Sequence, residues 1–292
     1  MVAISVGGSR AALSVTRNCF NALTSLRRPD AARSLWVDAI CIDQTDVAEQ
    51  SVQVKIMNKV YARGLRTVIY LGEATPGTDL LFEELAEAEL SLDRPAPSAT
   101  IVQQLEELLI RPWFRRVWVV QEAYVSKSRL VMCGRRQATW KVLHDCLLGF
   151  GNNNRVTADV LPPVFMVDKS PHNYNCIWQN LWVCLNVTRA LLATDSGDKL
   201  FALKALLGRN QDEIDQLIDY RRTIPAIFTD VATHLLNSMG LVSLIAIRSP
   251  HDRSMVSWVP DWSQTHSWNS EMLVTGDIDS LSFRSGSLQQ YR

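Results

Sequence analysis

The sequence lacks the features that mark membrane, secreted and nucleic-acid-binding chains. Its longest apolar run, residues 239–247, is about nine residues long and contains Ser243, whereas a transmembrane helix needs roughly 18 apolar residues. The N-terminus has no basic start followed by an apolar stretch, so no secretory signal is predicted. The 30 basic side chains balance 30 acidic ones, which disfavours a broad electrostatic surface for nucleic acid. We therefore expect a cytoplasmic protein that binds neither membranes nor nucleic acid.

Metal and cofactor motifs are also missing. The six cysteines form no C-x-x-C pair and the five histidines are scattered, so neither a zinc site nor a Ser-His-Asp arrangement is predicted. Cys41 and Cys133 lie in apolar contexts, which favours buried, reduced thiols. Gly7-Gly8 lacks the rest of either Gly-rich phosphate-binding fingerprint. We expect no bound metal and no resident cofactor.

The composition is that of a globular protein. Hydrophobic residues make up 47% of the chain, and its 13 glycines and 11 prolines are too few for a low-complexity chain. The 292 residues suit two domains of ~150 residues each, or one large domain with extensions. A linker-like stretch containing Gly151 and Pro162-Pro163 follows residue 150. We therefore divide the chain into residues 1–150 and a mainly helical region over residues 151–292.

Strand and helix patterns alternate in the first of these regions. Short strands are predicted within residues 4–15 and buried strands at 35–42, 67–71 and 129–133. Helices are predicted at 18–27, 46–64, 78–91, 99–110, 139–149, 177–192, 198–207 and 224–238. Asn18 is the predicted cap of the first helix and Asp46 that of the second, with Glu49 in capping-box position. Residues 111–125 fit either a strand or a helix. The alternation predicts an α/β fold with a mostly parallel sheet flanked by helices.

Two sequence blocks resemble the fungal heterokaryon-incompatibility (HET) domain. The first pattern runs W-x-D-A-x-C-I-x-Q, then D-x-x-E, Q-V, M, I/V-Y and L-G. It is matched by Trp36, Asp38, Ala39, Cys41, Ile42, Gln44, Asp46, Glu49, Gln53, Val54, Met57, Val60, Tyr61, Leu71 and Gly72. The second pattern, R-P-W-F-x-R-x-W-V-x-Q-E, is matched by Arg111, Pro112, Trp113, Phe114, Arg116, Trp118, Val119, Gln121 and Glu122.

This resemblance implies a TIR-like (flavodoxin-like) fold for residues 1–150. It also implies a role in nonself recognition that triggers cell death when unlike hyphae fuse, through a protein partner or self-association. Members of the family usually begin with a strand that carries a Tyr-x-Trp-Gly motif, and no such motif precedes Ile4. We therefore expect an N-terminally truncated HET domain, without a strand that would help to line a pocket.

Glu122 is the catalytic candidate that the resemblance implies. NAD-cleaving members of the TIR fold carry W-C-x-x-E with an essential glutamate, and Trp118 and Glu122 have the same spacing, with Val119 in place of the cysteine. The substrate would be NAD, and the carboxylate would stabilise an oxocarbenium-like centre as in glycoside hydrolysis. The alternative is structural, with Glu122 paired to an arginine within residues 111–116.

Three polar residues around the predicted strand 35–42 are candidates for ligand binding. Asp38 lies in an apolar segment, where a carboxylate needs a partner such as Arg116 or backbone N–H groups. Asp43 and Gln44 follow the strand, and ligands of open α/β sheets bind beyond the carboxyl ends of strands. Turn chemistry explains Asp43 in part but leaves Gln44 without a structural reason.

Two functions remain open on the sequence. In the first, the domain is an effector that degrades NAD, with Glu122 central, Trp118 stacking on the ligand and the arginines at 111, 115 and 116 clamping phosphates. In the second, it is a non-enzymatic interaction or scaffold module, or an inactive truncated paralogue, and the same residues maintain fold and oligomer contacts.

Overall fold

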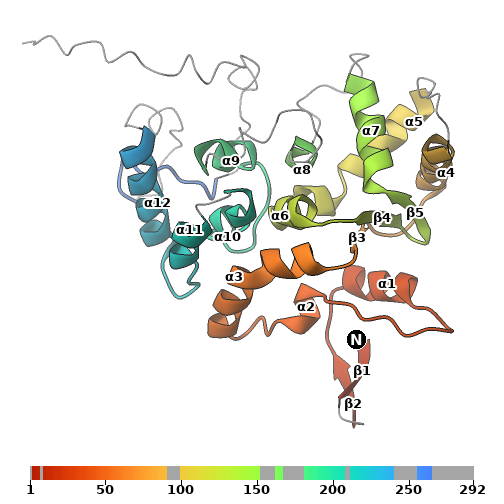
Figure 1. Ribbon diagram of the computed structural model, residues 1–292, viewed down its shortest axis with the longest axis horizontal. Helices are drawn as coiled ribbons and strands as arrows, with labels where there is room; N and C mark the ends of the chain where they lie inside the picture. The colour runs from red at the N-terminus through yellow and green to blue at the C-terminus, as the bar shows by residue number, and fades with distance from the viewer. Residues whose placement is uncertain are drawn as a thin grey trace, which may run out of the picture.

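The computed structural model describes residues 2–6, 9–90, 99–151, 162–166, 181–207, 211–239 and 255–264. A three-stranded sheet lies at the centre of the first half of the chain (Figure 1). Helices α4 (Pro76–Leu90), α5 (Ala99–Leu109) and α7 (Trp140–Gly151) lie above it in this view, and α1 (Arg17–Leu26) lies below. The fold of this half is therefore α/β, as predicted, with helices on both faces of a small sheet.

The sheet is mixed rather than mostly parallel, which corrects the prediction. Its order is β3 (Thr67–Tyr70), β4 (Arg129–Cys133), β5 (Arg136–Thr139), with β3 parallel to β4 and β4 antiparallel to β5. Gly134 makes the tight β4–β5 turn with a positive φ of 54°, where a side chain would be strained. Strand β5 was not predicted, because it starts with the polar pair Arg136-Gln137 and has no apolar run.

The two faces of the sheet have different surroundings. On one face Ile69, Val131, Cys133 and Ala138 are buried, and α4 and α7 contact the strands there. On the other face α1 covers the sheet and contributes no buried residue. One face is therefore a packed core, whereas the other is only partly filled.

Helix α6 (Trp118–Val125) settles the ambiguous segment 111–125 as helical. It follows a 3-10 turn, η1 (Pro112–Arg115), and residues 119–123 are all buried. Burial of consecutive residues means that the helix is packed on every side, which an apolar run alone does not distinguish from a buried strand. Its neighbours are α3 (Val47–Arg63), α8 (Pro163–Met166) and η3 (Lys204–Leu206).

The predicted buried strand at 35–42 is wrong. Residues 38–41 form a short helix, α2 (Asp38–Cys41), and Leu35 is exposed while Ile42 is buried. The Asp38 carboxylate accepts a hydrogen bond from the Ala39 N–H at 2.7 Å, and the Cys41 N–H bonds to the Val37 carbonyl at 2.8 Å. The aspartate side chain thus hydrogen-bonds to the neighbouring backbone, and this local bond competes with the backbone pairing that a strand would need. Asp38 consequently lies at a helix start and not inside a sheet.

Other helix predictions are confirmed with altered ends. Asp46 caps α3, accepting from the N–H groups of Ala48 and Glu49 at 2.9 and 3.1 Å. The Glu49 carboxylate accepts from the Asp43 N–H at 3.2 Å and so supports the preceding turn. The cap of α1 is Thr16, which accepts from the Cys19 N–H at 3.2 Å, so the prediction of Asn18 is wrong.

The remaining elements lie at the two ends of the chain. An antiparallel hairpin, β1 (Val2–Val6) and β2 (Ser9–Leu13), precedes α1, as predicted for residues 4–15. Beyond residue 180 the described α-helices are α9 (Leu181–Val187), α10 (Asp198–Phe201), α11 (Gln211–Leu217) and α12 (Ile224–Met239). The predicted helices 177–192 and 198–207 are therefore shorter than expected, and the first begins outside the described residues.

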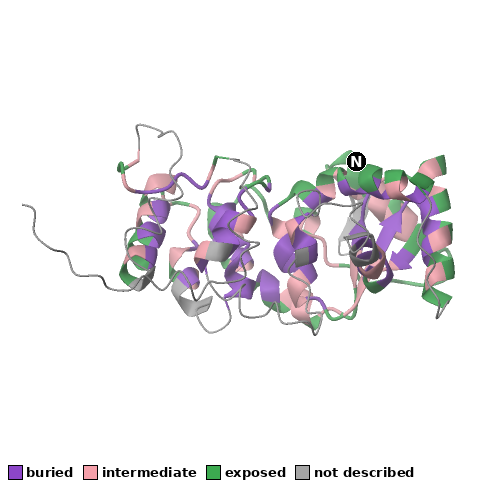
Figure 2. Cartoon of the chain, turned by 90° about the horizontal axis from the view of Figure 1, so that it is seen from above, coloured by how far each residue is buried: buried purple, intermediate pink, exposed green. Residues whose placement is uncertain are grey.

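One hydrophobic core connects the two regions that the sequence analysis separated. Phe165 stacks on Trp140 with ring centroids 4.6 Å apart, and the Lys204 ammonium donates to the Lys55 carbonyl of α3 at 2.5 Å. Figure 2 shows buried residues through the interior of both regions. Among the described helices, none is both long and apolar enough to cross a membrane.

The Asp46 cap leads to a stability prediction. Asp46→Ala leaves two N–H groups at the start of α3 without their acceptor and is expected to lower the free energy of unfolding by about 1 kcal/mol. Asp46→Asn keeps the acceptor and should retain most of that stability. Urea unfolding of both variants and the wild type measures the difference. Equal losses for alanine and asparagine would contradict the capping role.

Candidate functional site

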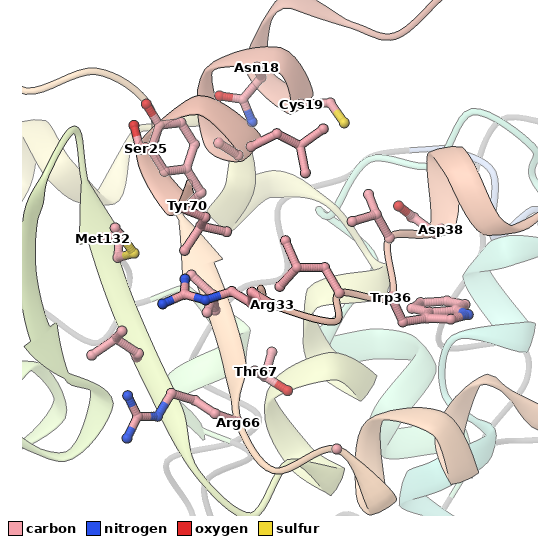
Figure 3. A pocket seen from close by; sticks show the side chains of 18 of the residues that line it. Asn18, Cys19, Ser25, Arg33, Trp36, Asp38, Arg66, Thr67, Tyr70 and Met132 are labelled. Atoms are coloured by element: carbon pink, nitrogen blue, oxygen red, sulfur yellow. The ribbon is translucent and has the colours of Figure 1, made fainter. Parts of the chain in front are cut away.

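A cavity of about 1950 Å³ lies between α1 and the partly filled face of the sheet (Figure 3). We call it the α1–sheet cavity. Val68 and Tyr70 of β3, Leu130 and Met132 of β4 and Gln137 of β5 form its floor. Side chains alternate between the two faces of a strand, so these residues share the face opposite the packed core. Its other walls come from α1, residues 27–39, the end of α3 and the η1–α6 segment.

One end of the cavity carries two carboxyl groups and a guanidinium group. Asp38, Arg116 and Glu122 all line it. The Arg116 Nη2 atom lies 3.7 Å from the Asp38 Oδ2 atom, with side-chain exposures of 48% and 36%. The partner that sequence reasoning required for Asp38 is therefore Arg116. An ion pair this exposed contributes little to stability, so its position beside the cavity is the more informative property.

Glu122 is buried and yet forms part of the cavity wall. Its residue exposure is 6%, and it lies on α6 within a helix packed on all sides. Burial raises the pKa of its carboxyl group, the charge of Arg116 opposes that rise, and the charge of Asp38 reinforces it. A side-chain hydrogen bond from Trp113 stabilises the ionised form. A carboxyl group with a raised pKa at a cavity wall is a candidate for acid–base or charge-stabilising chemistry.

Aromatic side chains surround this polar end. Trp36, Tyr61 and Trp113 line the cavity beside Glu122. The Trp36 and Tyr61 rings meet edge to face with centroids 5.5 Å apart. Burial, followed by the charges of Glu122 and Asp38, raises the pKa of Tyr61 well above its ordinary value. The Tyr61 hydroxyl is therefore protonated at neutral pH and can only donate or accept hydrogen bonds.

Two predicted ligand residues, Asp43 and Gln44, do not line the cavity. The Asp43 carboxylate accepts from the Thr45 hydroxyl at 2.7 Å and from its N–H at 2.9 Å, and these bonds lower its pKa. The Gln44 side-chain amide donates to the Asp38 and Ile42 carbonyl groups at 3.3 and 3.4 Å. Both side chains stabilise the α2–α3 turn. The prediction placed them after a strand, beyond which a ligand would bind, but residues 38–41 form a helix instead.

Trp118 and Arg111 have structural partners away from Glu122. Trp118 is outside the cavity lining, and its side chain hydrogen-bonds to Asp198. The Arg111 Nη1 atom donates to the Leu71 and Glu73 carbonyl groups, both at 3.0 Å. Of the arginines predicted as a phosphate clamp or as partners of Glu122, Arg116 alone lines the cavity.

Sequence reasoning gave no role to Asp198, which extends the polar cluster. Burial raises its pKa to about 6, although hydrogen bonds from Tyr220 and Trp118 act in the opposite direction. The Tyr220 hydroxyl donates to the Asp198 Oδ1 atom at 2.5 Å. Burial works to lower the pKa of Arg116, but the charges of Glu122, Asp38 and Asp198 raise it overall.

Comparison with known proteins finds a family match for the part of the chain that forms most of this cavity. Residues 3–122 match the family model of the heterokaryon incompatibility protein (HET). The chain therefore carries a HET domain, and the matched stretch ends at Glu122.

A curated relative extends the likeness beyond the domain. It is the "Heterokaryon incompatibility protein 6, OR allele" of Neurospora crassa, which is 23% identical over 84% of this chain and 47% of its own length. The chain thus spans about half the length of this relative. No solved structure matches the chain. Within the described residues, no group of three or more His, Cys, Asp or Glu side chains is placed to hold a metal ion.

The raised pKa of Asp198 predicts a pH dependence of stability. Its native pKa of about 6 exceeds the ordinary 3.8, so the native state binds more protons than the unfolded state between these values. The contribution of Asp198 to stability is therefore present below pH 4 and is lost as pH rises to about 6. Asp198→Asn should remove this loss, on the order of 2 kcal/mol, from the profile of unfolding free energy against pH.

Tyr220→Phe is the matched control for this experiment. It retains the carboxyl group and removes a hydrogen bond that lowers its pKa, so the loss of stability should continue to higher pH. Urea unfolding at several pH values measures all three proteins. Parallel profiles for the wild type and Asp198→Asn would contradict the assignment.

Proposed function

We propose that this chain acts in fungal heterokaryon incompatibility by cleaving NAD in the α1–sheet cavity. In this proposal it works in the cytoplasm, where nonself recognition through a protein partner or self-association starts cell-death signalling. The HET domain and the Neurospora relative support the incompatibility role. The observation that carries the enzymatic part is the buried carboxyl group of Glu122 at the wall of a ligand-sized cavity.

The reaction breaks the bond between the nicotinamide nitrogen and C1′ of the ribose. Nicotinamide leaves with the bonding electron pair, and water adds to C1′ and releases a proton, so the products are nicotinamide and ADP-ribose. The ionised Glu122 carboxylate stabilises the positive charge that develops at C1′. One carboxylate suffices because nicotinamide is already a good leaving group.

Arg116 and Trp113 prepare Glu122 for this role. The positive charge of Arg116 favours the ionised carboxylate against the effect of burial, and the hydrogen bond from Trp113 acts in the same direction. Trp36 and Trp113 provide aromatic surfaces at the same end of the cavity, which suit a positively charged nicotinamide ring. Arg116 is thus a positioning residue, because it acts through Glu122.

The second candidate function is a non-enzymatic interaction module. One observation favours it. In the described sheet β3 is an edge strand, paired with β4 on one side alone. An open strand edge beside a partly filled face can accept a strand from another chain. Under this alternative Glu122 and Arg116 serve only to hold η1 and α6 together.

NAD consumption by the purified chain tests the proposal. The wild type should release nicotinamide, and Glu122→Gln, which retains the shape of the side chain, should lower the rate by about 100-fold or more. Asp43→Asn is the matched control, because Asp43 lies outside the cavity, and its rate should equal that of the wild type. Circular dichroism and thermal unfolding check that each variant is folded. Absence of turnover by a folded, self-associated wild type would favour the interaction module.

The charges around Glu122 predict opposite shifts in the pH profile of turnover. Activity of the ionised carboxylate rises as pH passes its pKa. Arg116→Gln removes a charge that lowers this pKa, so the rise should move to higher pH. Asp38→Asn removes a charge that raises it, so the rise should move to lower pH. Rates of nicotinamide release between pH 5 and 9 measure both shifts. Shifts in the same direction would contradict the assigned roles.

A further inference from the structure

The charges that line the α1–sheet cavity are strongly unbalanced. The whole chain has a formal net charge of zero. The cavity, however, is lined by six arginines and only two carboxylates, Asp38 and Glu122, which both lie beside Arg116. The five arginines away from this polar end are Arg27, Arg28, Arg33, Arg66 and Arg135. We call them the arginine group.

No carboxylate neutralises the arginine group within the described part of the chain. Arg136, on the neighbouring strand β5, is by contrast paired: it contacts Asp79 and Glu83, both at 2.8 Å. Arg135, the residue before it in the β4–β5 turn, lines the cavity and has no carboxylate partner among the residues that the structure describes. The positive charge is thus concentrated on the cavity side of that turn.

The arginine group comes from separate segments that meet over one face of the sheet. Arg33 belongs to the α1–α2 connection, Arg66 directly precedes β3, and Arg135 lies in the β4–β5 turn. Figure 3 shows the Arg33 and Arg66 guanidinium groups over β3 and β4, across the cavity from Trp36 and Asp38. The cavity therefore has a cationic end and an acidic, aromatic end.

We propose that the arginine group is a phosphate-binding subsite for a nucleotide with a diphosphate. Guanidinium groups bind phosphate oxygens through paired, charge-assisted hydrogen bonds. The apolar floor of Val68, Leu130 and Met132 suits the rest of a nucleotide, which free phosphate does not have. The volume exceeds that of common small-ligand pockets, so a molecule of dinucleotide size can enter.

Nucleic acid fits these observations less well than a small nucleotide. Binding of a polymer needs positive charge spread along an outer surface. Here the uncompensated charge lines a concave cavity in a chain of zero net charge. The orientation of the bound nucleotide rests on the proposed function, since the phosphates in this subsite would place the reacting sugar toward Glu122. Its affinity is measurable without any turnover.

Binding of ADP and adenosine to the Glu122→Gln chain tests the subsite. Quenching of tryptophan fluorescence and calorimetry report the Kd of each ligand. We expect ADP to bind at least tenfold more tightly than adenosine, and its affinity to fall as salt rises. The double variant Arg33→Gln, Arg66→Gln should weaken ADP binding by tenfold or more and leave adenosine binding unchanged. Both arginines are exposed, so the fold should survive.

Arg63→Gln is the matched control, because it also removes an exposed arginine but lies outside the cavity lining. It should leave the ADP affinity unchanged. Equal affinities for ADP and adenosine, or no effect of the double variant, would overturn the subsite. Tighter binding of a single-stranded oligonucleotide than of ADP would overturn the assigned ligand class.

The two proposals fail in different ways. Arginine-dependent ADP binding without NAD cleavage by the wild type would support the subsite and refute the proposed reaction. NAD cleavage whose KM is unchanged by the double variant would support the reaction and refute the subsite.

Discussion

The positive charge of Arg116 is the feature on which the polar end of the molecule depends. Asp38, Glu122 and Asp198 all act on it, although they come from distant segments. A carboxyl group as buried as that of Glu122 needs an opposite charge or a proton. Arg116 supplies that charge, and its backbone is held where the Val117 N–H donates to the Leu192 carbonyl at 2.9 Å. The HET domain and the helices after it therefore meet beside Arg116, whose charge opposes the rise of the Glu122 pKa that burial causes.

The second constraint is the unequal packing of the sheet. Strand alternation places Ile69, Val131 and Ala138 in a core with α4 and α7, and places Val68 and Leu130 toward α1. Helix α1 buries no residue of its own, so the space beneath it stays open. Protein interiors tolerate few voids, and a large open volume against a sheet is a place for a ligand or another chain. The charges at its two ends favour the ligand.

The sequence predicted the local structure of each element better than it predicted which elements lie next to one another. The Asp46 cap and the helices α3 to α5 depend on contacts within a few residues, and strands β3 and β4 are marked by their apolar runs; all are confirmed. The segment 35–42 is apolar enough for a strand, but Asp38 starts a helical turn there. Strand β5 depends on pairing with β4, which its polar residues do not reveal. These errors arise because tertiary contacts determine which segment an apolar or polar run packs against or pairs with, and the run itself does not indicate that segment.

By itself the sequence determined the HET domain match and the alternation of helices and strands, and it singled out Asp38, Arg116 and Glu122 as separate candidate site residues. The tertiary structure alone decided which side chains share the α1–sheet cavity. It placed Asp43 and Gln44 in a turn and Trp118 against Asp198. It also brought Arg33 and Arg135 together in the lining of one cavity. The physical reason is that a motif reflects the spacing of residues within one segment. A site is formed by several segments, and their distances apart in the sequence do not indicate which of them lie close together in the fold.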